Sequence, residues 1–398
     1  MKAVIFAAGK STRTYPLTLT RPKPLLPVAN RPILAHQLDA LKGIVDAVIV
    51  VIGYRGDMIR ERFGDRYGDI AIEYVEQKEQ LGTGHALLQC AGHVNVPFLV
   101  LNGAALYDRH DLAAPAALDQ GGLARTIEDP RQYAIYEIDK DHNAVRIVEK
   151  PTEVFSHLAN VGAYKFSPEV FDRLKTVKPS VRGEIEITSA IQLLADERKF
   201  RVVEANGYWI PIGYPWHLLE ATTFYLDSFH SERIDGEVSP AAHLHGAVSI
   251  GMGTVIRPGV VIDGPVIIGE NCTIGPNAWI RPYSAIGDGC KIGQASEIKC
   301  SILMDGAAVP HLSYIGDSIV GQDANIGCGT ITANFRHDGK NHRSMVKGEL
   351  VDTGRRKFGT VIGDGVHTGI NTSIYPGRKL WPGTSTLPGE IVEHDKEA

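Results

Sequence analysis

The stretch from Ile250 to Ile298 reads IGMGTVIRPGVVIDGPVIIGENCTIGPNAWIRPYSAIGDGCKIGQASEI and has an isoleucine at every sixth position. A helix would place apolar residues three and four positions apart, and a half-exposed strand would place them two apart. A period of six is typical of a chain that turns a corner after each six residues and points one branched side chain inward per face. The stretch therefore predicts a parallel β-helix built from hexapeptide repeats. Its nine periodic residues are Ile250, Ile256, Ile262, Ile268, Ile274, Ile280, Ile286, Ile292 and Ile298.

The repeat loosens after Ile298 and resumes in patches such as Ile315-Gly316 and Ile326-Gly327. Between the patches we expect two irregular excursions, one around residues 299–314 and one over 334–357. Insertions in a regular solenoid usually lie on one face and carry binding groups. These two segments are therefore the first places to look for a site in this half of the chain.

The composition limits the classes of function. A chain of 398 residues predicts two or three domains, and its net charge of -5 gives no sign of a nucleic-acid-binding surface. The apolar start, Met1 to Ala8, is too short for a signal core, and no stretch has the length of a membrane span. The five cysteines include no CxxC pair. We therefore expect reduced thiols in a cytoplasmic protein, without a disulfide framework or a zinc site.

The first 235 residues follow a different pattern. Apolar strand candidates alternate with helix-like stretches such as 33–42, which predicts βαβ units and a parallel sheet covered by helices, a Rossmann-like α/β domain. The turn Ala7 to Arg13 follows the first strand, where such sheets bind phosphates through backbone N–H groups. An apolar helix over about 216–231 and then Gly236 mark the boundary, so we expect domains at 1–235 and 236–398. The strand candidates are 3–7, 47–52, 70–74 and 97–101.

The continuation of this turn resembles the sugar-phosphate nucleotidylyltransferases, whose signature is G-x-G-T-R-x-x-P-x-T followed by P-K-P. The resemblance covers about 230 residues. It implies transfer of a uridylyl or thymidylyl group to a sugar 1-phosphate, with UTP as the expected nucleotide. The matching motifs, in order, are Gly9–Thr18, Arg21–Val28, Gln80–Ala86, Asn102-Gly103, Glu149–Pro151 and Asn160–Gly162.

The resemblance also implies roles for individual residues. Arg13 and Lys23 would act in catalysis by binding the triphosphate beside Gly9. The reaction brings two anions together, so cations and oriented N–H groups supply most of the catalysis. The other implied substrate-binding residues are Gln80, Gly82 and Thr83 in the motif that reads the pyrimidine base, and Gly103, Glu149 and Asn160 around the sugar.

The chain departs from the family pattern where Mg²⁺ would bind. The two expected aspartates are replaced by Ala104 and Pro211, which have no side-chain oxygen to offer. A third polar position is Ser189, and Ser11 replaces the second glycine of the phosphate loop, which is tolerable if its φ is negative. We therefore expect no metal-binding residue here, doubtful Mg²⁺ binding and severely weakened nucleotidyl transfer. Asp108 or Asp111 is the alternative source of a carboxylate.

The β-helix resembles the acetyltransferase half of the bifunctional enzyme that makes UDP-N-acetylglucosamine, in particular archaeal-type members with a long insertion like residues 335–357. These solenoids are left-handed. The resemblance implies acetyl transfer from acetyl-CoA to glucosamine 1-phosphate, with His311 as the general base, because an imidazole that titrates near neutrality suits removal of a proton from an ammonium group. The other implied residues are Arg281 and Lys299 at the sugar phosphate, Tyr314 and Asn325 at the amino sugar, and Asn334 and Lys357 along the coenzyme.

The same resemblance implies a homotrimer or a dimer of trimers. Two other functions compete with a bifunctional enzyme. One is a non-catalytic regulator that binds nucleotides and sugar phosphates, like subunits of the translation-initiation exchange factor, and the missing metal ligands favour it for the N-terminal half. The other is a mannose-1-phosphate guanylyltransferase, which Gln80 and His311 disfavour. The set of candidate residues on the β-helix favours the acetyltransferase.

Overall fold

The computed structural model describes residues 1–229 and 231–397 of the chain. Its contacts divide it into two compact units, which are described separately below. Unit 1 comprises Met1–Lys10, Pro22–Leu25 and Ile33–Pro211. Unit 2 comprises Ser11–Arg21, Leu26–Pro32 and the chain from Ile212 onward. The expected domain boundary near residue 236 stays a prediction, and the first coil of the solenoid begins at Arg233.

Unit 1 is built around a ten-stranded sheet whose main path runs β11-β10-β12-β7-β1-β4-β6-β5. The central strands β7, β1, β4 and β6 are parallel, as the sequence predicted, but β12 runs antiparallel to β7 and β10 antiparallel to β11. The four strands that the sequence indicated are therefore parallel as expected, and the strands that follow them make the sheet mixed, because a short turn rather than a crossover helix joins β10 to β11. The strands are β1 (Lys2–Phe6), β4 (Ala47–Ile52), β5 (Arg66–Tyr67), β6 (Ile70–Glu76), β7 (Phe98–Asn102), β9 (Gly121–Thr126), β10 (Ala134–Ile138), β11 (Ala144–Glu149), β12 (Leu158–Phe166) and β13 (Arg201–Glu204).

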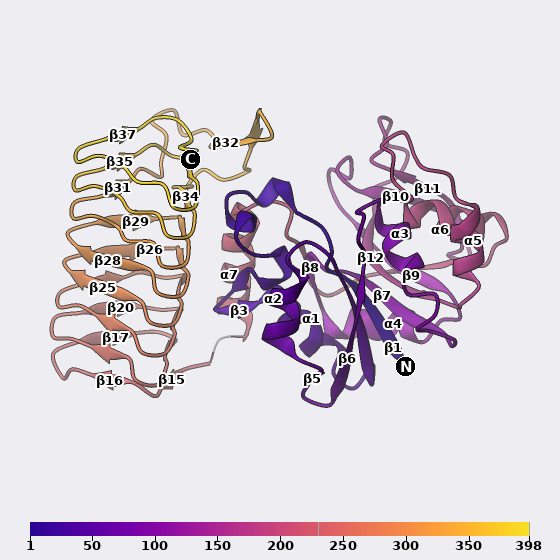
Figure 1. Ribbon diagram of the computed structural model, residues 1–398, viewed down its shortest axis with the longest axis horizontal. Coiled ribbons are helices and arrows are strands. Elements are labelled where there is room, and N and C mark those ends of the chain that lie inside the picture. Colours follow the sequence, from indigo (N-terminus) through magenta and orange to yellow (C-terminus); the bar gives the residue numbers. More distant parts are fainter. Residues whose placement is uncertain (230, 398) are drawn as a thin grey trace. The chain divides into compact units, whose positions relative to one another are not determined.

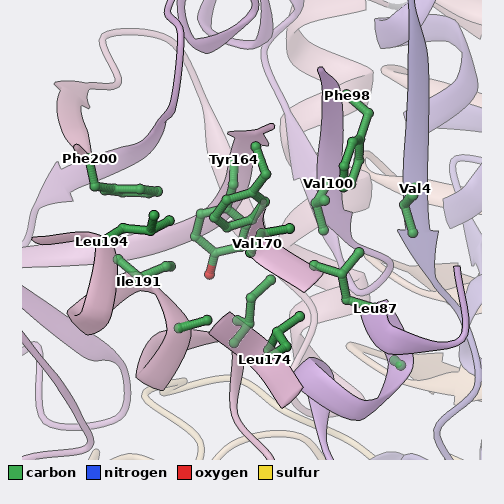
Figure 2. Close-up of a cluster of buried hydrophobic side chains, with 14 of the residues drawn as sticks. Val4, Leu87, Phe98, Val100, Tyr164, Val170, Leu174, Ile191, Leu194 and Phe200 are labelled. Carbon is green, nitrogen blue, oxygen red and sulfur yellow. The ribbon is translucent and has the colours of Figure 1, made fainter. Parts of the chain in front are cut away.

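Helices cover this sheet and close its core. Figure 2 shows aromatic and branched side chains of β1, β7 and β12 meeting those of α3, α5 and α6 in one buried cluster that includes Phe98, Val100 and Tyr164. A second apolar cluster contains residues of α1, α2 and α4 together with strand residues such as Ile5 and Val50. The helices of unit 1 are α1 (Ile33–Leu41), α2 (Gly56–Phe63), α3 (Thr83–Leu88), α4 (Arg109–Ala116), α5 (Val170–Thr176) and α6 (Ile187–Asp196).

Unit 2 is mainly a left-handed parallel β-helix, and Figure 1 shows its strands stacked coil upon coil from β16 to β37. Three parallel sheets form its faces. Face 1 contains β15 (Arg233–Ile234), β18 (Val248–Ile250), β21 (Val266–Ile268), β24 (Ser284–Ile286), β27 (Ile302–Leu303), β30 (Ile319–Val320), β34 (Val361–Ile362) and β36 (Lys379–Leu380). Face 2 contains β16 (Glu237–Val238), β19 (Val255–Ile256), β22 (Thr273–Ile274), β25 (Lys291–Gln294) and β28 (Ala308–His311). Face 3 contains β17 (His243–His245), β20 (Val261–Asp263), β23 (Trp279–Ile280), β26 (Glu297–Lys299), β29 (Tyr314–Gly316), β31 (Ile331–Thr332), β35 (Ser373–Ile374) and β37 (Ile391–Val392).

The periodic isoleucines stack in three buried columns, one on each face. Ile250 pairs with Ile268 and then Ile286 on face 1, and the other six continue in the same way on faces 2 and 3. All nine are essentially inaccessible to solvent. A branched side chain every sixth residue therefore fills the solenoid core, which confirms the hexapeptide interpretation.

The first expected excursion is wrong and the second is confirmed. Residues 299–314 form an ordinary coil that contains β27 and β28, but Ile298 pairs with Ile315, so this coil is one residue shorter than those before it. The loosened repeat reflects this slip and not an insertion. Residues 334–357 do leave the coil, and they fold into the antiparallel hairpin of β32 (Arg343–Val346) and β33 (Glu349–Asp352).

The remaining elements are two short strand pairs and one helix before the solenoid. Strand β8 (Ala105–Tyr107) pairs with β14 (Trp209–Pro211) in unit 1, and β2 (Pro27–Val28) pairs with β3 (Arg31–Pro32) in unit 2. Helix α7 (Trp216–Phe229) confirms the helix expected before the solenoid, although position 230 of that expectation lies outside the described residues. All five cysteines are free, and no helix among the described residues is both long and apolar enough to cross a bilayer.

Candidate active sites

The parallel strands of unit 1 end at one edge of the sheet, and Gly9 and Gly103 lie just beyond β1 and β7. The backbone N–H of Gly103 donates to the Phe6 carbonyl oxygen at 3.1 Å, which holds the two strand ends together. A Cβ at position 103 would collide with that oxygen, so only glycine fits. The carboxyl edge of such a sheet is where α/β proteins usually bind ligands.

The segment 80–86, which is expected to bind the pyrimidine base, is held in place by hydrogen bonds from nearby amide side chains. Gln80 donates through Nε2 to the Gln77 carbonyl oxygen at 3.3 Å, and Gln77 donates to the Gly82 carbonyl oxygen at 3.1 Å. The Thr83 hydroxyl accepts from the backbone N–H of Ile187 at 3.1 Å, at the start of α6. These contacts give Gly82 and Thr83 defined places beside α3.

Glu149 and Asn160, the residues expected at the sugar, lie on strands that flank β10. Ala134 of β10 pairs with Glu149, and Ile135 pairs with Ala159, so the two candidate residues are close in register. The Asn160 amide donates to the Tyr164 hydroxyl at 2.7 Å and accepts from Gly162 N–H at 3.0 Å. Burial raises the pKa of Glu149, and the guanidinium of Arg182, 3.6 Å away, opposes that shift.

The two positions that would hold a metal are neighbours in the structure. In the ladder of β8 and β14, Pro211 lies opposite Ala105, one residue from Ala104. Both Ala104 and Pro211 are half-buried, so they are partly open to a ligand. A methyl group and a pyrrolidine ring cannot coordinate Mg²⁺, which requires oxygen donors. The residues present do not fit the metal that the family pattern implies.

The candidate replacement carboxylates are engaged in backbone contacts. Asp108 caps α4 by accepting from His110 N–H at 2.8 Å. Asp111 accepts from Asn206 N–H at 3.0 Å and from Gly207 N–H at 2.9 Å. Within the described residues, no cluster of three or more His, Cys, Asp and Glu side chains could hold a metal ion. The alternative in which Asp108 or Asp111 supplies the missing ligand gains no support.

The phosphate loop differs from expectation at Ser11, whose φ of 53° lies in the left-handed region. The condition for tolerating a serine here, a negative φ, is not met, because the loop keeps the glycine-type backbone. In unit 2, the Ser11 carbonyl accepts from the hydroxyls of Thr14 and Thr18 at 2.7 and 2.9 Å. The Arg13 guanidinium carbon lies 5.4 Å from the centre of the Tyr214 ring. Lys23 lies in the short helix η3 (Lys23–Leu25) of unit 1, and Ser189 lies in the first turn of α6.

On the β-helix, three candidate residues, Lys299, Tyr314 and Asn334, gather around Asp317 where face 3 turns towards face 1. Lys299 Nζ lies 2.7 Å from Asp317 Oδ2, and Asn334 Nδ2 donates to the same oxygen at 2.6 Å. Asn334 Nδ2 also donates to the Tyr314 hydroxyl at 2.9 Å. Burial raises the pKa of the Tyr314 hydroxyl, an effect that the charge of Lys299 opposes.

Arg281 lies one coil below this group, because its backbone N–H donates to Ile298 beside Lys299. Its guanidinium pairs with Glu297 at 2.7 Å and lies over the Trp279 ring, 4.5 Å from the ring centre. Both expected phosphate-binding cations therefore already have a carboxylate partner.

Asp317 is the residue that the sequence interpretation missed. Its side chain is buried, and it joins Lys299 to Asn334. A strict period of 18 between coils would put residue 317 directly above Lys299, but the short coil puts Gly316 there instead. Asp317 follows with a φ of 51°, which turns its side chain back to the lysine. The slip from Ile298 to Ile315 was the available signal.

His311 and Asn325 belong to face 2, so the structure does not place them directly with the face 3 group. His311 ends β28 opposite Gln294, and Asn325 bridges Ala308 on the same face. His311 is exposed, and its backbone and Tyr314 are separated only by the corner residues 312 and 313. Face 3, which is three residues wide here, thus has His311 at one edge and Lys299 with Asn334 at the other.

Asn334 and Lys357, the expected coenzyme residues, mark the two ends of the insertion. Phe335 bridges Lys357, and the Asn334 carbonyl oxygen accepts from Phe358 N–H at 3.1 Å. The insertion therefore leaves and rejoins the coil beside the Tyr314–Asp317 group. Lys357 is exposed.

Comparisons with known proteins cover both halves. A family model described as "Nucleotidyl transferase" matches residues 2–228, and one described as "GMPPB C-terminal domain" matches residues 262–377. A solved structure entitled "The Crystal Structure of UDP-glucose pyrophosphorylase complexed with UDP-glucose" aligns with a TM-score of 0.53 at 24% identity, over 57% of this chain and 98% of that one. This likeness bears on the fold of the N-terminal half.

Curated relatives span nearly the whole chain. The "Bifunctional protein GlmU" of Methanococcus maripaludis strain C7 is 44% identical over 100% of this chain and 96% of its own length, and that of Methanococcus aeolicus is 40% identical over 99% and 96%. The "Bifunctional sugar-1-phosphate nucleotidylyltransferase/acetyltransferase" of Sulfurisphaera tokodaii is 36% identical over 99% of this chain and 98% of its own length. The chain therefore belongs to the family of bifunctional GlmU-type enzymes, the sugar-1-phosphate nucleotidylyltransferase/acetyltransferases.

Proposed function

We propose that the β-helix transfers the acetyl group of acetyl-CoA to the amine of glucosamine 1-phosphate. The observation that carries the proposal is the arrangement along face 3. A cationic edge, Arg281 and Lys299, faces a candidate base, His311, across one three-residue strand. A strand of this length spans about 10 Å, which matches the scale of a phosphorylated amino sugar.

The chemistry assigns each group a task. His311 in its neutral form accepts a proton from the sugar ammonium, and the freed amine nitrogen attacks the thioester carbonyl carbon. The C–S bond then breaks, and the coenzyme leaves as a thiol after it takes up a proton. Tyr314 would orient the sugar, and its hydroxyl accepts a 2.9 Å hydrogen bond from the amide of Asn334, the residue expected beside the coenzyme. An imidazole can both accept and return a proton, which suits a general base in this step.

For the N-terminal half, the proposal is a domain that binds UTP and a sugar 1-phosphate but transfers the uridylyl group poorly. The elements that support binding are the strand edge at Gly9 and Gly103 and the sugar-side residues Glu149 and Asn160. Against efficient transfer stand Ala104 and Pro211, which leave the expected metal without protein oxygen ligands.

The proposal includes a homotrimer or a dimer of trimers, with a neighbouring subunit completing each acetyl-transfer site. The exposed apolar side chains that surround the candidate site support it. Trp279, Leu312, Ile331 and Phe335 are each between 40% and 59% exposed, and an apolar surface of this kind is usual where protein surfaces associate.

Thiol release from acetyl-CoA in the presence of glucosamine 1-phosphate tests the proposal. The His311→Asn variant keeps the approximate side-chain shape and removes the base, so we expect a fall of about a hundredfold to ten thousandfold in kcat. His245→Asn is the matched control, because His245 is also exposed on this β-helix but lies several coils away. Full activity in His311→Asn would contradict the assignment of His311 as the base. Absence of sugar-dependent thiol release from the wild type would contradict acetyl transfer and favour a non-catalytic regulator.

A further inference from the structure

The corner at which face 1 turns towards face 2 repeats one hydrogen bond in several coils. After three of the face 1 strands, an aspartate oxygen accepts from the backbone N–H at the equivalent position one coil earlier. Asp288 Oδ1 accepts from Glu270 N–H at 2.8 Å, Asp305 Oδ1 from Asp288 N–H at 2.9 Å, and Asp364 Oδ1 from Gln322 N–H at 2.8 Å. This capping bond is common to the three carboxylates, so it gives none of them a special role.

Asp364 differs from its two counterparts in burial and in the partners of its second oxygen. The counterparts are exposed, whereas the side chain of Asp364 is only 16% exposed. Its Oδ2 accepts from Thr20 Oγ1 at 2.6 Å and from Arg21 Nη2 at 2.5 Å. The same nitrogen of Arg21 also donates to Gln322 Oε1 at 3.0 Å. The β-helix therefore binds the end of the segment Ser11–Arg21, which belongs to the same compact unit.

The attachment of Arg21 depends on the charge of Asp364. The Arg21 side chain is 14% exposed, and its Nε is buried with no hydrogen-bond partner among the described residues. A guanidinium that has lost this much water needs its carboxylate, because removal of one partner of a buried ion pair leaves an uncompensated charge. Charge-assisted hydrogen bonds are also stronger than neutral ones. Asp364 therefore supplies the charge that holds Arg21 in place.

The other end of the segment lies on an aromatic stack. The Arg13 guanidinium carbon is 5.4 Å from the centre of the Tyr214 ring, a distance at which a cation is attracted to the ring face. The Tyr214 ring stacks on that of Trp216, with 4.6 Å between centres and 10° between planes. Trp216 is buried and packs edge-on against Phe358 of the β-helix at 5.9 Å. The segment Ser11–Arg21 is thus attached to unit 2 near both of its ends.

We propose that Asp364 is a positioning residue for nucleotide binding. It acts through Arg21 and holds the backbone of Ser11–Arg21, which carries Arg13, in the conformation that binds the triphosphate. A segment that is in its binding conformation for only part of the time lowers the apparent affinity by that fraction. The inference rests on the proposed binding of UTP by the N-terminal half. A residue of the β-helix thereby serves the site to which the other reaction is assigned.

Calorimetric titration of UTP into the full-length protein tests this role without any need for turnover. Asp364→Asn retains the oxygen that caps the coil and turns an amide N–H₂ towards Thr20 and Arg21, so that donors face donors. We expect UTP to bind about tenfold to a hundredfold more weakly, the range for loss of one charge-assisted hydrogen bond. Asp305→Asn is the matched control, because Asp305 makes the same capping bond and is exposed. It should bind UTP as the wild type does.

Two further measurements separate positioning from general destabilisation. UMP lacks the two outer phosphates, so its affinity should change much less than that of UTP in Asp364→Asn. The double variant Arg21→Met/Asp364→Asn leaves no uncompensated buried charge at this attachment and should recover the thermal stability that Asp364→Asn loses. Its UTP binding should nevertheless stay weak, because the attachment of the segment is still missing.

The outcomes distinguish this inference from the function on which it rests. If the wild type binds UTP and Asp364→Asn binds it equally well, the positioning role is wrong. Equal losses for UTP and UMP, or recovery of UTP binding together with stability in the double variant, would also overturn it, because both would point to folding alone. If the wild type does not bind UTP at all, the proposed function of the N-terminal half fails, and the role of Asp364 fails with it.

Discussion

The sharpest prediction concerns the two positions at which the metal-binding aspartates are replaced. The double variant Ala104→Asp/Pro211→Asp would put two carboxylates beside each other on the β8–β14 ladder, where Pro211 now lies opposite Ala105. Both positions are half-buried, so the new carboxylates would keep part of their solvation. The change should create a site for Mg²⁺ between positions 104 and 211, where the side chains now present have no oxygen to offer.

The expected size of the effect follows from what the missing groups do. Removal of a single group that stabilises transition-state charge typically costs 10²–10³-fold in rate, about 3–4 kcal/mol. Two ligands of one ion act together, so their contributions do not simply add. We therefore expect the double variant to raise uridylyl transfer at least about a hundredfold, and either single variant to give a much smaller gain.

The assay is pyrophosphate release from UTP and N-acetylglucosamine 1-phosphate with Mg²⁺, accompanied by calorimetric titration of Mg²⁺ into the UTP complex. Asp108→Asn is the informative companion variant, because asparagine retains the cap on α4 and removes the charge. Wild-type turnover of about 1 per second or faster would refute the reasoning. If Asp108→Asn abolished such turnover, Asp108 would be the overlooked ligand.

Two further predictions concern stability. Ser11→Gly should stabilise the protein by roughly 0.5–1 kcal/mol. An L-residue at a φ of 53° costs about 1–2 kcal/mol, and the larger conformational entropy that glycine loses on folding offsets part of the gain from removing that cost. A lower urea midpoint in the variant would argue instead for a stabilising contact of the Ser11 side chain. Burial lowers the pKa of Lys379 from 10.5 to about 8, an effect that Asp395 opposes and Arg378 reinforces. The folded state therefore binds fewer protons than the unfolded state between these two values, and stability should rise by up to about 3 kcal/mol as the pH increases from about 8 to 10.5. Thermal unfolding across this range should show that rise in the wild type and not in Lys379→Met, and an equal rise in both would rule out Lys379 as its origin.

The sequence predicted the fold well where one physical rule governs many residues. The solenoid core enforces a period of six, so the nine periodic isoleucines from Ile250 to Ile298 were expected to point inward, and they do. The helix expected over 33–42 is α1 almost to the residue. The sequence did not predict the shorter coil after Ile298, because a slip of one residue changes the repeat pattern only slightly. It also did not predict the antiparallel β10–β11 pair, because a tight turn has no strong signal in the composition.

The sequence predicted which residues belong to the candidate acetyl-transfer site but not which of them contact one another. Lys299, Tyr314 and Asn334 were expected, and the structure brings them to one group, but Asp317, which joins two of them, was missed. His311 lies at the other edge of face 3, a separation that depends on which corner follows β28. The spacing of three residues between His311 and Tyr314 does not tell whether the two lie on the same face, since three residues can cross a corner or run straight along a strand.

The side chains of Ala104 and Pro211 contribute little to the packing at this edge of the sheet. The β8–β14 ladder pairs through Ala105, Leu106 and Tyr107, and neither Ala104 nor the Pro211 ring belongs to the buried apolar core. The contacts that shape this edge come from elsewhere: Gln37 donates to the Asn102 and Ala105 carbonyls, and Asp111 holds the backbone at residues 206 and 207. Because the fold at this edge does not depend on the two substituted side chains, the aspartate variants should fold as the wild type does. If the double variant then failed to turn over UTP, the chemistry assigned to these positions would be wrong, and loss of folding would not be the cause.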